Sequence, residues 1–140
     1  MANTQAVSGT MKQVALGAVV DGKTLKAALY LASATTNGTN TAYTATGEVS
    51  GTNYTAGGVS VTNANAAGLT STTAYWTPSA SITFTTVTLA TAFDAVMIYS
   101  TTDTNRSLGV FTFGSQTITA GTFTLTMPTN DSSTGLIRFA

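Results

Sequence analysis

The sequence predicts an all-β fold: a single-domain antiparallel β-sandwich of the jelly-roll-like kind with eight to ten short strands. Threonine fills 32 of the 140 positions, and this β-branched residue is enriched in strands. In the second half of the chain, short apolar segments recur with turn signals between them, which is typical of sandwiches and barrels. Hydrophobic residues make up 43% of the chain and the net charge is zero, which indicates a globular domain rather than a disordered segment.

The N-terminal residues 1–12 are predicted to be a flexible arm in front of a β-sandwich domain at 13–140, because the chain begins with small, polar residues. Gln13–Val20 is strand-like, and the Asp21-Gly22 pair after it is a strong signal for a two-residue hairpin turn. We therefore expect a first strand at Gln13–Val20 that turns back into the next segment.

The segment after this turn fits two periods. Large apolar residues alternate over 24–31, from Leu25 to Leu31, as in a strand with one buried face. A helix over 23–34 is the alternative, because Leu25, Leu29 and Ala32 also fit a 3.6-residue period. Helix propensity favours the helix and the preceding hairpin signal favours the strand, which we predict.

Residues 34–58 are polar and punctuated by glycine, so they are predicted to form a long loop. A short strand is predicted at Val59–Thr62 and a second loop at 63–73. Seven further strands are predicted, at Ala74–Thr77, Ser81–Leu89, Phe93–Tyr99, Leu108–Phe113, Gln116–Thr119, Thr122–Met127 and Leu136–Phe139. A bulge near Thr85-Thr86 would let the apolar residues of the second of these face the core together.

The residue types exclude most catalytic and metal chemistry. The chain has no histidine and no cysteine, the side chains that general acid–base catalysis and soft-metal sites usually need. We therefore expect no enzymatic activity, no catalytic, cofactor-binding or metal-binding residues, and no cofactor. Asp103-Thr104-Asn105 offers oxygen ligands of the kind that calcium binds, but the rest of a calcium loop is missing. The carboxylates are scattered singly, at Asp21, Glu48, Asp94, Asp103 and Asp131.

The balance of charges limits the classes of partner that the chain is expected to bind. Five basic residues balance five acidic ones, so the chain lacks the basic footprint of a nucleic-acid-binding protein. It has no apolar stretch long enough for a membrane helix and no signal peptide at its start, so we expect no membrane partner and synthesis in the cytoplasm. A neutral surface favours association with other protein chains.

The aromatic residues allow two interpretations. Tyr75 and Trp76, together with Tyr43 and Tyr54, would suit an exposed platform for a sugar. A single tryptophan next to a predicted strand more often fills the core or a subunit interface. We predict a structural role for Trp76.

Several stretches form a recognisable pattern. The sequence has LKAALY at 25–30, TAYTATGEVSG at 41–51 and YTAGG at 54–58, and later stretches agree at Ala95–Tyr99, Phe113-Gly114, Gly121–Thr124 and Gly135–Phe139. Over residues 24–139 the chain resembles small virion structural proteins of tailed bacteriophages, of the head decoration (cement) type. Asn53 stands where glycine is expected in such proteins, and 79–91 lacks the basic residue that they often carry.

The resemblance implies a capsid decoration protein that binds the outer shell and bridges capsid subunits. Its partners would be the major capsid protein and further copies of itself, as a homotrimer or homodimer. It would lie on the capsid surface of the virion after synthesis in the host cytoplasm. The alternatives are a host-recognition or carbohydrate-binding module of a head or tail fibre, with its sugar site at Tyr75-Trp76, and a minor tail or neck structural protein.

Overall fold

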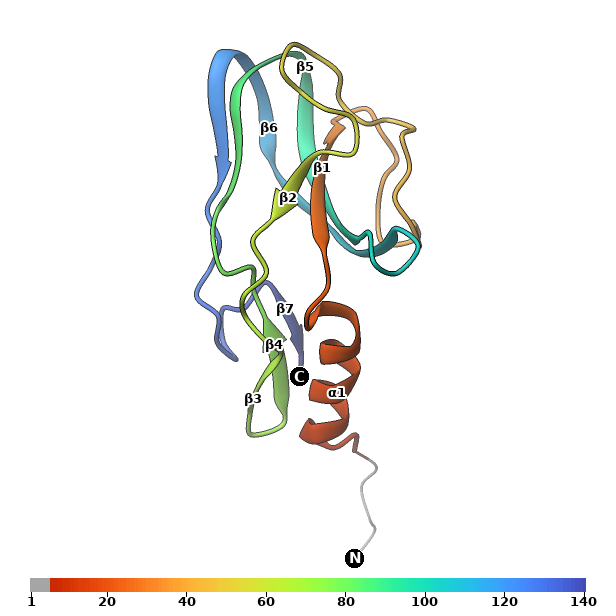
Figure 1. Ribbon diagram of the computed structural model, residues 1–140, viewed down its shortest axis with the longest axis vertical. Coiled ribbons are helices and arrows are strands. Elements are labelled where there is room, and N and C mark those ends of the chain that lie inside the picture. The colour runs from red at the N-terminus through yellow and green to blue at the C-terminus, as the bar shows by residue number, and fades with distance from the viewer. Residues whose placement is uncertain (1–5) are drawn as a thin grey trace, which may run out of the picture.

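The computed structural model describes residues 6–140 of the chain (Figure 1). The strand pairs in this part are antiparallel, which confirms the prediction of a predominantly β chain with antiparallel sheets. One sheet has the order β2-β1-β5-β6 and a smaller one the order β3-β4-β7. The elements are α1 (Gly9–Val20), β1 (Leu25–Leu31), β2 (Val59–Val61), β3 (Gly68–Thr70), β4 (Thr73–Trp76), β5 (Ile82–Ser100), β6 (Arg106–Leu125) and β7 (Ile137–Phe139).

The strand predicted at Gln13–Val20 is wrong, because these residues belong to helix α1. Ser8 caps the helix: its hydroxyl oxygen accepts a hydrogen bond from the Met11 backbone N–H at 3.2 Å. Leu16 and Val20, four residues apart and therefore on the same helical face, are buried. The segment is apolar around its whole circumference, so its pattern does not separate a strand from a helix, and packing on the small sheet decides.

The helix begins at Gly9, inside the segment 1–12 that was expected to be an arm. Residues 1–5 of that segment lie outside the described part of the chain. Asp21 and Gly22, expected at a hairpin, instead form the turn between α1 and β1. Gly22 adopts a positive φ of 65° there, a conformation that favours glycine.

Strand β1 forms as predicted, and the helical alternative is wrong. It pairs with β2 on one side and with β5 on the other. Its residues from Ala27 to Tyr30 are all buried, so this part of the sheet is covered on both faces. Two strand partners and two covered faces outweigh the helix propensity of the segment, because sheet packing overrides a weak local preference.

Strands β5 and β6 form one long antiparallel hairpin, which absorbs five of the strands predicted separately between 81 and 127. The bulge predicted in β5 is confirmed. The register with β6 shifts between Phe84 and Val87, and Thr86 between them has a φ of 51°. The shift leaves the four apolar residues around it buried, namely Ile82, Phe84, Val87 and Leu89.

The hairpin is doubled over on itself (Figure 1): the first arm of β5 rises in green and the second descends in blue-green, with β6 alongside. The register shifts at the bend, between Leu89 and Phe93 of β5. Aromatic rings from both arms pack against one another, with centroids 5.1–6.2 Å apart. This cluster consists of Phe84, Phe93, Phe113 and Phe123. It fixes the second arm of the hairpin against the first.

Helix α1 covers the small sheet. The Lys12 ammonium donates to the Thr72 carbonyl at 3.2 Å, and the Gln13 amide donates to the Ala67 carbonyl at 2.9 Å. The segment 63–73, which was predicted to be a loop, contains strand β3. Its Ala67 and Thr72 carbonyls hold the helix in place. Buried residues of the helix, the small sheet and the large sheet belong to one continuous hydrophobic core.

Candidate docking site at the edge of strand β6

Strand β6 forms one edge of the four-stranded sheet, since it pairs with β5 on one side. On its other side, the described residues make contacts at the start of the strand. Arg106 bridges to Ala42, and the Ser107 N–H donates to the Thr41 carbonyl at 3.0 Å. Beyond Ser107, no strand within residues 6–140 pairs with the outer edge. The strand therefore presents a row of unpaired backbone N–H and C=O groups.

This edge lacks two of the usual protections, charge and proline, and its bulges lie outside residues 109–112. Natural edge strands carry charged side chains, prolines or bulges, or lie under a loop. Residues 107–127 contain no charged residue and no proline. Residues 109–112 pair with Ala95–Ile98 in regular register. Residues 109–112 of β6 thus form a short, uncharged and regular edge that can accept a further strand.

The side chains of β6 are incompletely covered. No residue of β6 is buried, although its large apolar side chains touch the core: Leu108, Val110, Phe111, Phe113, Ile118, Phe123 and Leu125. A mostly apolar cavity of about 130 Å³ lies between the two arms of the hairpin, lined by residues that include Phe111, Phe113, Leu125 and Met127. A segment laid along this edge would bury apolar surface as well as pair backbone groups. We call the outer edge of β6 beyond Ser107, together with this cavity, the β6 site.

The segment between β1 and β2 covers one face of the sheet, and Glu48 holds it in place. The Glu48 carboxylate accepts hydrogen bonds from the Tyr43 hydroxyl at 2.6 Å, the Tyr54 hydroxyl at 2.7 Å and the Gly57 N–H at 2.7 Å. The Tyr54 oxygen in turn accepts from the Leu29 N–H of β1 at 3.0 Å. These bonds tie the segment to the sheet at several points, so it forms an ordered cover.

Tyrosines from the sheet complete this cover. The Tyr99 hydroxyl donates to the Gly57 carbonyl at 2.7 Å, and the Tyr30 hydroxyl donates to the Thr44 carbonyl at 2.6 Å. The ring of Tyr99 stacks on that of Tyr43, with centroids 4.8 Å apart. Strand and cover therefore contact each other through both rings and hydroxyls.

The hydroxyls of this cluster keep their protons well above neutral pH. Burial raises the pKa of Tyr30 to about 12 and also raises the pKa of Tyr99. Burial, and then the hydrogen bond to Glu48, raise the pKa of Tyr43 and Tyr54. These groups therefore act as hydrogen-bond donors at neutral pH.

The same geometry explains the most distinctive part of the sequence, GEVSG followed by YTAGG. Its glutamate is Glu48, which organises the cover. Gly57 and Gly58 have positive φ angles of 87° and 73°, and a side chain at Gly58 would collide with the Ala27 carbonyl of β1. This motif therefore specifies the conformation of the cover and how closely it approaches β1.

Trp76 lies in the core, as predicted, with its side chain fully buried. Its indole N–H lies 3.2 Å from the Asn63 side-chain oxygen and 3.1 Å from the Asn65 carbonyl, and it donates to both. A buried ring cannot present a face to a sugar, so the structure does not provide the platform of Tyr75, Trp76, Tyr43 and Tyr54. The last two instead bind Glu48.

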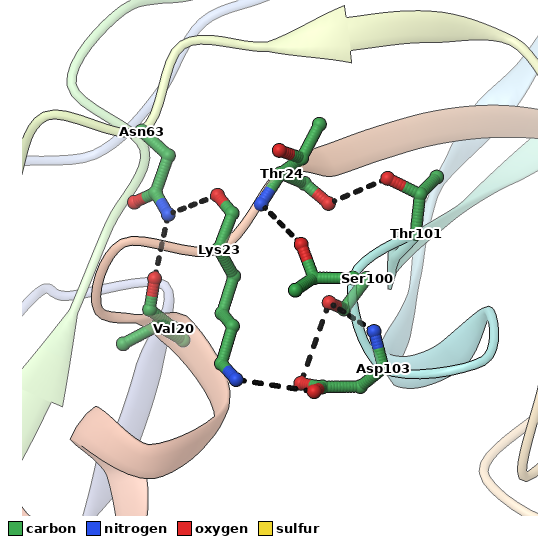
Figure 2. A network of polar contacts seen from close by, with 8 residues as sticks. Val20, Lys23, Thr24, Asn63, Ser100, Thr101 and Asp103 are labelled. Carbon is green, nitrogen blue, oxygen red and sulfur yellow. Dashed lines mark hydrogen bonds and ion pairs between the residues drawn. The ribbon is translucent and has the colours of Figure 1, made fainter.

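Asp103, considered above as a calcium ligand, takes part in a structural network (Figure 2). Its carboxylate pairs with the Lys23 ammonium at 3.1 Å, and the Ser100 hydroxyl lies 3.4 Å from its second oxygen. The Thr101 N–H and hydroxyl both donate to the Thr24 carbonyl. This network joins the turn before β1 to the β5–β6 turn. Across residues 6–140, no group of three or more acidic, histidine or cysteine side chains is placed to hold a metal ion.

Sequence analysis did not identify the β6 site. The long uncharged run between Arg106 and Asp131 is the signal that points to it, but that run does not reveal that β6 lies at an edge.

In the described part of the chain, no helix is long and apolar enough to cross a membrane. Comparisons of the chain with protein-family models, curated proteins and solved structures gave no match.

Proposed function

We propose that this protein is a bacteriophage capsid decoration protein, which binds the outer shell and stabilises it by bridging capsid subunits. The observation that carries the proposal is the β6 site, an uncharged and unpaired strand edge above an apolar cavity. Such a surface suits a protein that completes its burial in an assembly. The resemblance over residues 24–139 supplies the phage context.

In this proposal a segment of the major capsid protein lies along the edge of β6 as an added strand. Backbone hydrogen bonds would give affinity, and apolar side chains would enter the cavity. Each contact is modest, and self-association into a homotrimer or homodimer makes binding to the shell multivalent. The doubled hairpin, with phenylalanines between its arms, supports the further proposal of a β-sandwich of the jelly-roll-like kind.

The test measures binding of purified protein to capsid shells that lack it, by co-sedimentation. Thr112→Lys places a charge on an exposed residue of the β6 edge, which natural edges use to prevent pairing, and it should abolish binding. The matched control is Thr62→Lys, an exposed residue just after β2, which should bind like the wild type. A wild type that does not bind would overturn the decoration function, and a Thr112→Lys variant that binds normally would overturn the β6 site.

The same assay, repeated at low salt and at about 0.5 M salt, tests the nature of the contact. Charge pairs are strongly screened over this range, because the Debye length falls from ~10 Å or more to a few Å. The β6 site lacks charges, so binding should change little. A loss of binding at high salt would contradict a neutral, apolar contact.

A further inference from the structure

The segment between β1 and β2 contains the pair Asn37-Gly38. Among the eight asparagines of the chain, Asn37 is the one that glycine follows. In such a pair the backbone nitrogen of the glycine can attack the side-chain amide carbon of the asparagine, because glycine has no side chain that hinders the approach and its backbone rotates freely. Both residues are exposed to solvent. The pair therefore places an amide carbon, which is an electrophile, next to a nitrogen nucleophile.

The surroundings of Gly38 leave its backbone nitrogen free to react. Within residues 6–140, no acceptor forms a hydrogen bond with the Gly38 N–H. A Cβ added at this glycine would meet no other atom within 4 Å. The residues on either side are held in a turn, in which the Asn37 N–H donates to the Asn40 Oδ1 at 2.8 Å and the Asn40 N–H donates to the Asn37 carbonyl at 3.0 Å. The turn is thus ordered, while the nucleophile within it is unbonded.

The side chain of Asn37 is folded back over its own backbone. Its Oδ1 accepts a hydrogen bond from the Thr39 N–H at 2.8 Å, and its Nδ2 donates to the Thr35 carbonyl at 3.0 Å. A bond from an asparagine side chain to the amide two residues further on keeps that side chain beside the intervening peptide unit, which here belongs to Gly38. Attack on Cγ develops negative charge on Oδ1, the oxygen that the Thr39 N–H already contacts. A donor at the atom where charge develops lowers the barrier to the reaction.

We propose that Asn37 is a site of spontaneous deamidation, with water as the co-reactant. The Gly38 nitrogen gives its proton to hydroxide and forms a bond to the Asn37 Cγ. The bond between Cγ and Nδ2 then breaks, and Nδ2 takes a proton from water and leaves as ammonia, so that a cyclic imide remains. Water adds to one of the two imide carbonyls and breaks its bond to the Gly38 nitrogen. Addition at Cγ yields aspartate, whereas addition at the main-chain carbonyl yields isoaspartate, in which the backbone runs through Cγ.

The reaction changes the charge of a neutral part of the molecule. The product has a carboxylate in the segment 32–47, which otherwise contains no charged residue. The net charge of the chain, which is zero, becomes negative by one unit. Gly38, next to the modified residue, lines a hollow together with Asn40, Thr41 and Arg106. The new carboxylate therefore lies on the loop that borders the start of β6. The proposal depends neither on the β6 site nor on the capsid.

The first experiment measures deamidation by peptide mapping after incubation of the folded protein at mildly alkaline pH. Chymotrypsin, which cuts after leucine and tyrosine, releases peptide 32–43, and this peptide contains both Asn37 and Asn40. Mass spectrometry should show that Asn37 converts about tenfold or more faster than Asn40, which threonine follows. Gly38→Val should slow the conversion of Asn37 by about tenfold or more, because a branched side chain hinders the attack. Equal rates at the two asparagines, or an unchanged rate in Gly38→Val, would overturn the proposal.

A second experiment tests the part that the loop conformation plays. Thr39→Pro removes the N–H that donates to the Asn37 Oδ1, so it should slow deamidation of the folded protein by about threefold or more. The control is the same pair of proteins in concentrated urea, where the loop has lost its conformation and the two rates should be equal. A folded wild type that reacts no faster than folded Thr39→Pro would overturn the role assigned to the Thr39 N–H. No capsid enters either experiment, so failure here is distinct from failure of the decoration function.

Discussion

Strands β5 and β6 are the two sides of one hairpin and have nearly equal length, with 19 and 20 residues. Both combine threonine with large apolar side chains, yet they are covered very differently. Every residue of β5 from Ala95 to Ser100 is buried, whereas no residue of β6 is. The reason is their position: β5 lies between β1 and β6, and β6 lies at the edge.

The comparison shows that similar composition leads to different roles. In β5, apolar side chains on both faces stabilise the fold, under the core on one face and the Glu48 cover on the other. In β6, comparable side chains stay half-exposed beside an apolar cavity. The segment of β5 from Ala95 to Ser100 is buried within one chain, whereas β6 keeps apolar surface that a second chain could bury.

The largest expected effect comes from placing a lysine on each strand at the same cross-strand pair, Ala95 and Thr112. Ala95 is buried among Tyr30, Met97 and Tyr99, so Ala95→Lys should lower the free energy of unfolding by more than about 4 kcal/mol or prevent folding. Thr112→Lys should change it by no more than about 0.5 kcal/mol. Urea unfolding of both variants checks this, and equal losses would remove the distinction between the strands.

Replacing one phenylalanine of each strand by alanine should also destabilise the protein more in β5 than in β6, with a smaller difference in unfolding free energy than for the lysine variants. Phe93 of β5 is fully buried and packs edge-on against Phe123, so Phe93→Ala should cost about 3–5 kcal/mol of unfolding free energy. Phe111 of β6 is only partly buried, so Phe111→Ala should cost about 1–2 kcal/mol. Calorimetry would show this as a much larger drop in melting temperature for the first variant. A larger drop for Phe111→Ala would mean that the edge is part of the essential core.

Alkaline pH should loosen the covered face of β5. The folded protein raises the pKa of Tyr30 from 10.0 to about 12, so it holds this proton more tightly than the unfolded chain does. The stability that this group contributes is therefore fully present below pH 10 and is lost as the pH rises through 12. Urea unfolding between pH 9 and about 12 should show this fall, and Tyr30→Phe should reduce it. A stability that does not change up to pH 12 would contradict the prediction.

Hydrogen exchange should reveal the smallest difference, at single amides. Amides of β5 at 95–98 should exchange slowly, because this segment has strand partners on both sides. Along 109–112 of β6, slow amides that donate to β5 should alternate with fast amides that point outward. Ser107 should be slow, since its N–H donates to the Thr41 carbonyl. Uniform protection along β6 in the isolated protein would show that its edge is already paired.

Sequence reasoning predicted the bulge at Thr85-Thr86 and the burial of Trp76, because side-chain alternation and a large aromatic side chain strongly constrain which face is inside. It also predicted β1, although that segment fits both a strand and a helix period and the hairpin signal that decided between them proved to be a turn from helix to strand. It failed at Gln13–Val20, which is apolar around the whole helix and therefore matches either period. It also divided β5 and β6 into shorter strands, because register shifts interrupt the alternation without ending the pairing.

The sequence by itself determined that this chain is predominantly β-structured, that it lacks histidine and cysteine, and that its residues 107–127 carry no charge. The tertiary structure decided that this uncharged segment lies at the edge of a sheet and that Met11 and Val14 of α1 stay exposed. It also decided that the Glu48 carboxylate accepts hydrogen bonds from three donors. The physical reason is that the alternation of apolar and polar side chains is a local property, which can be read from the residues of a single strand. Which strand receives a second neighbour depends on pairing between residues far apart in the chain, as between Leu25 and Ser100.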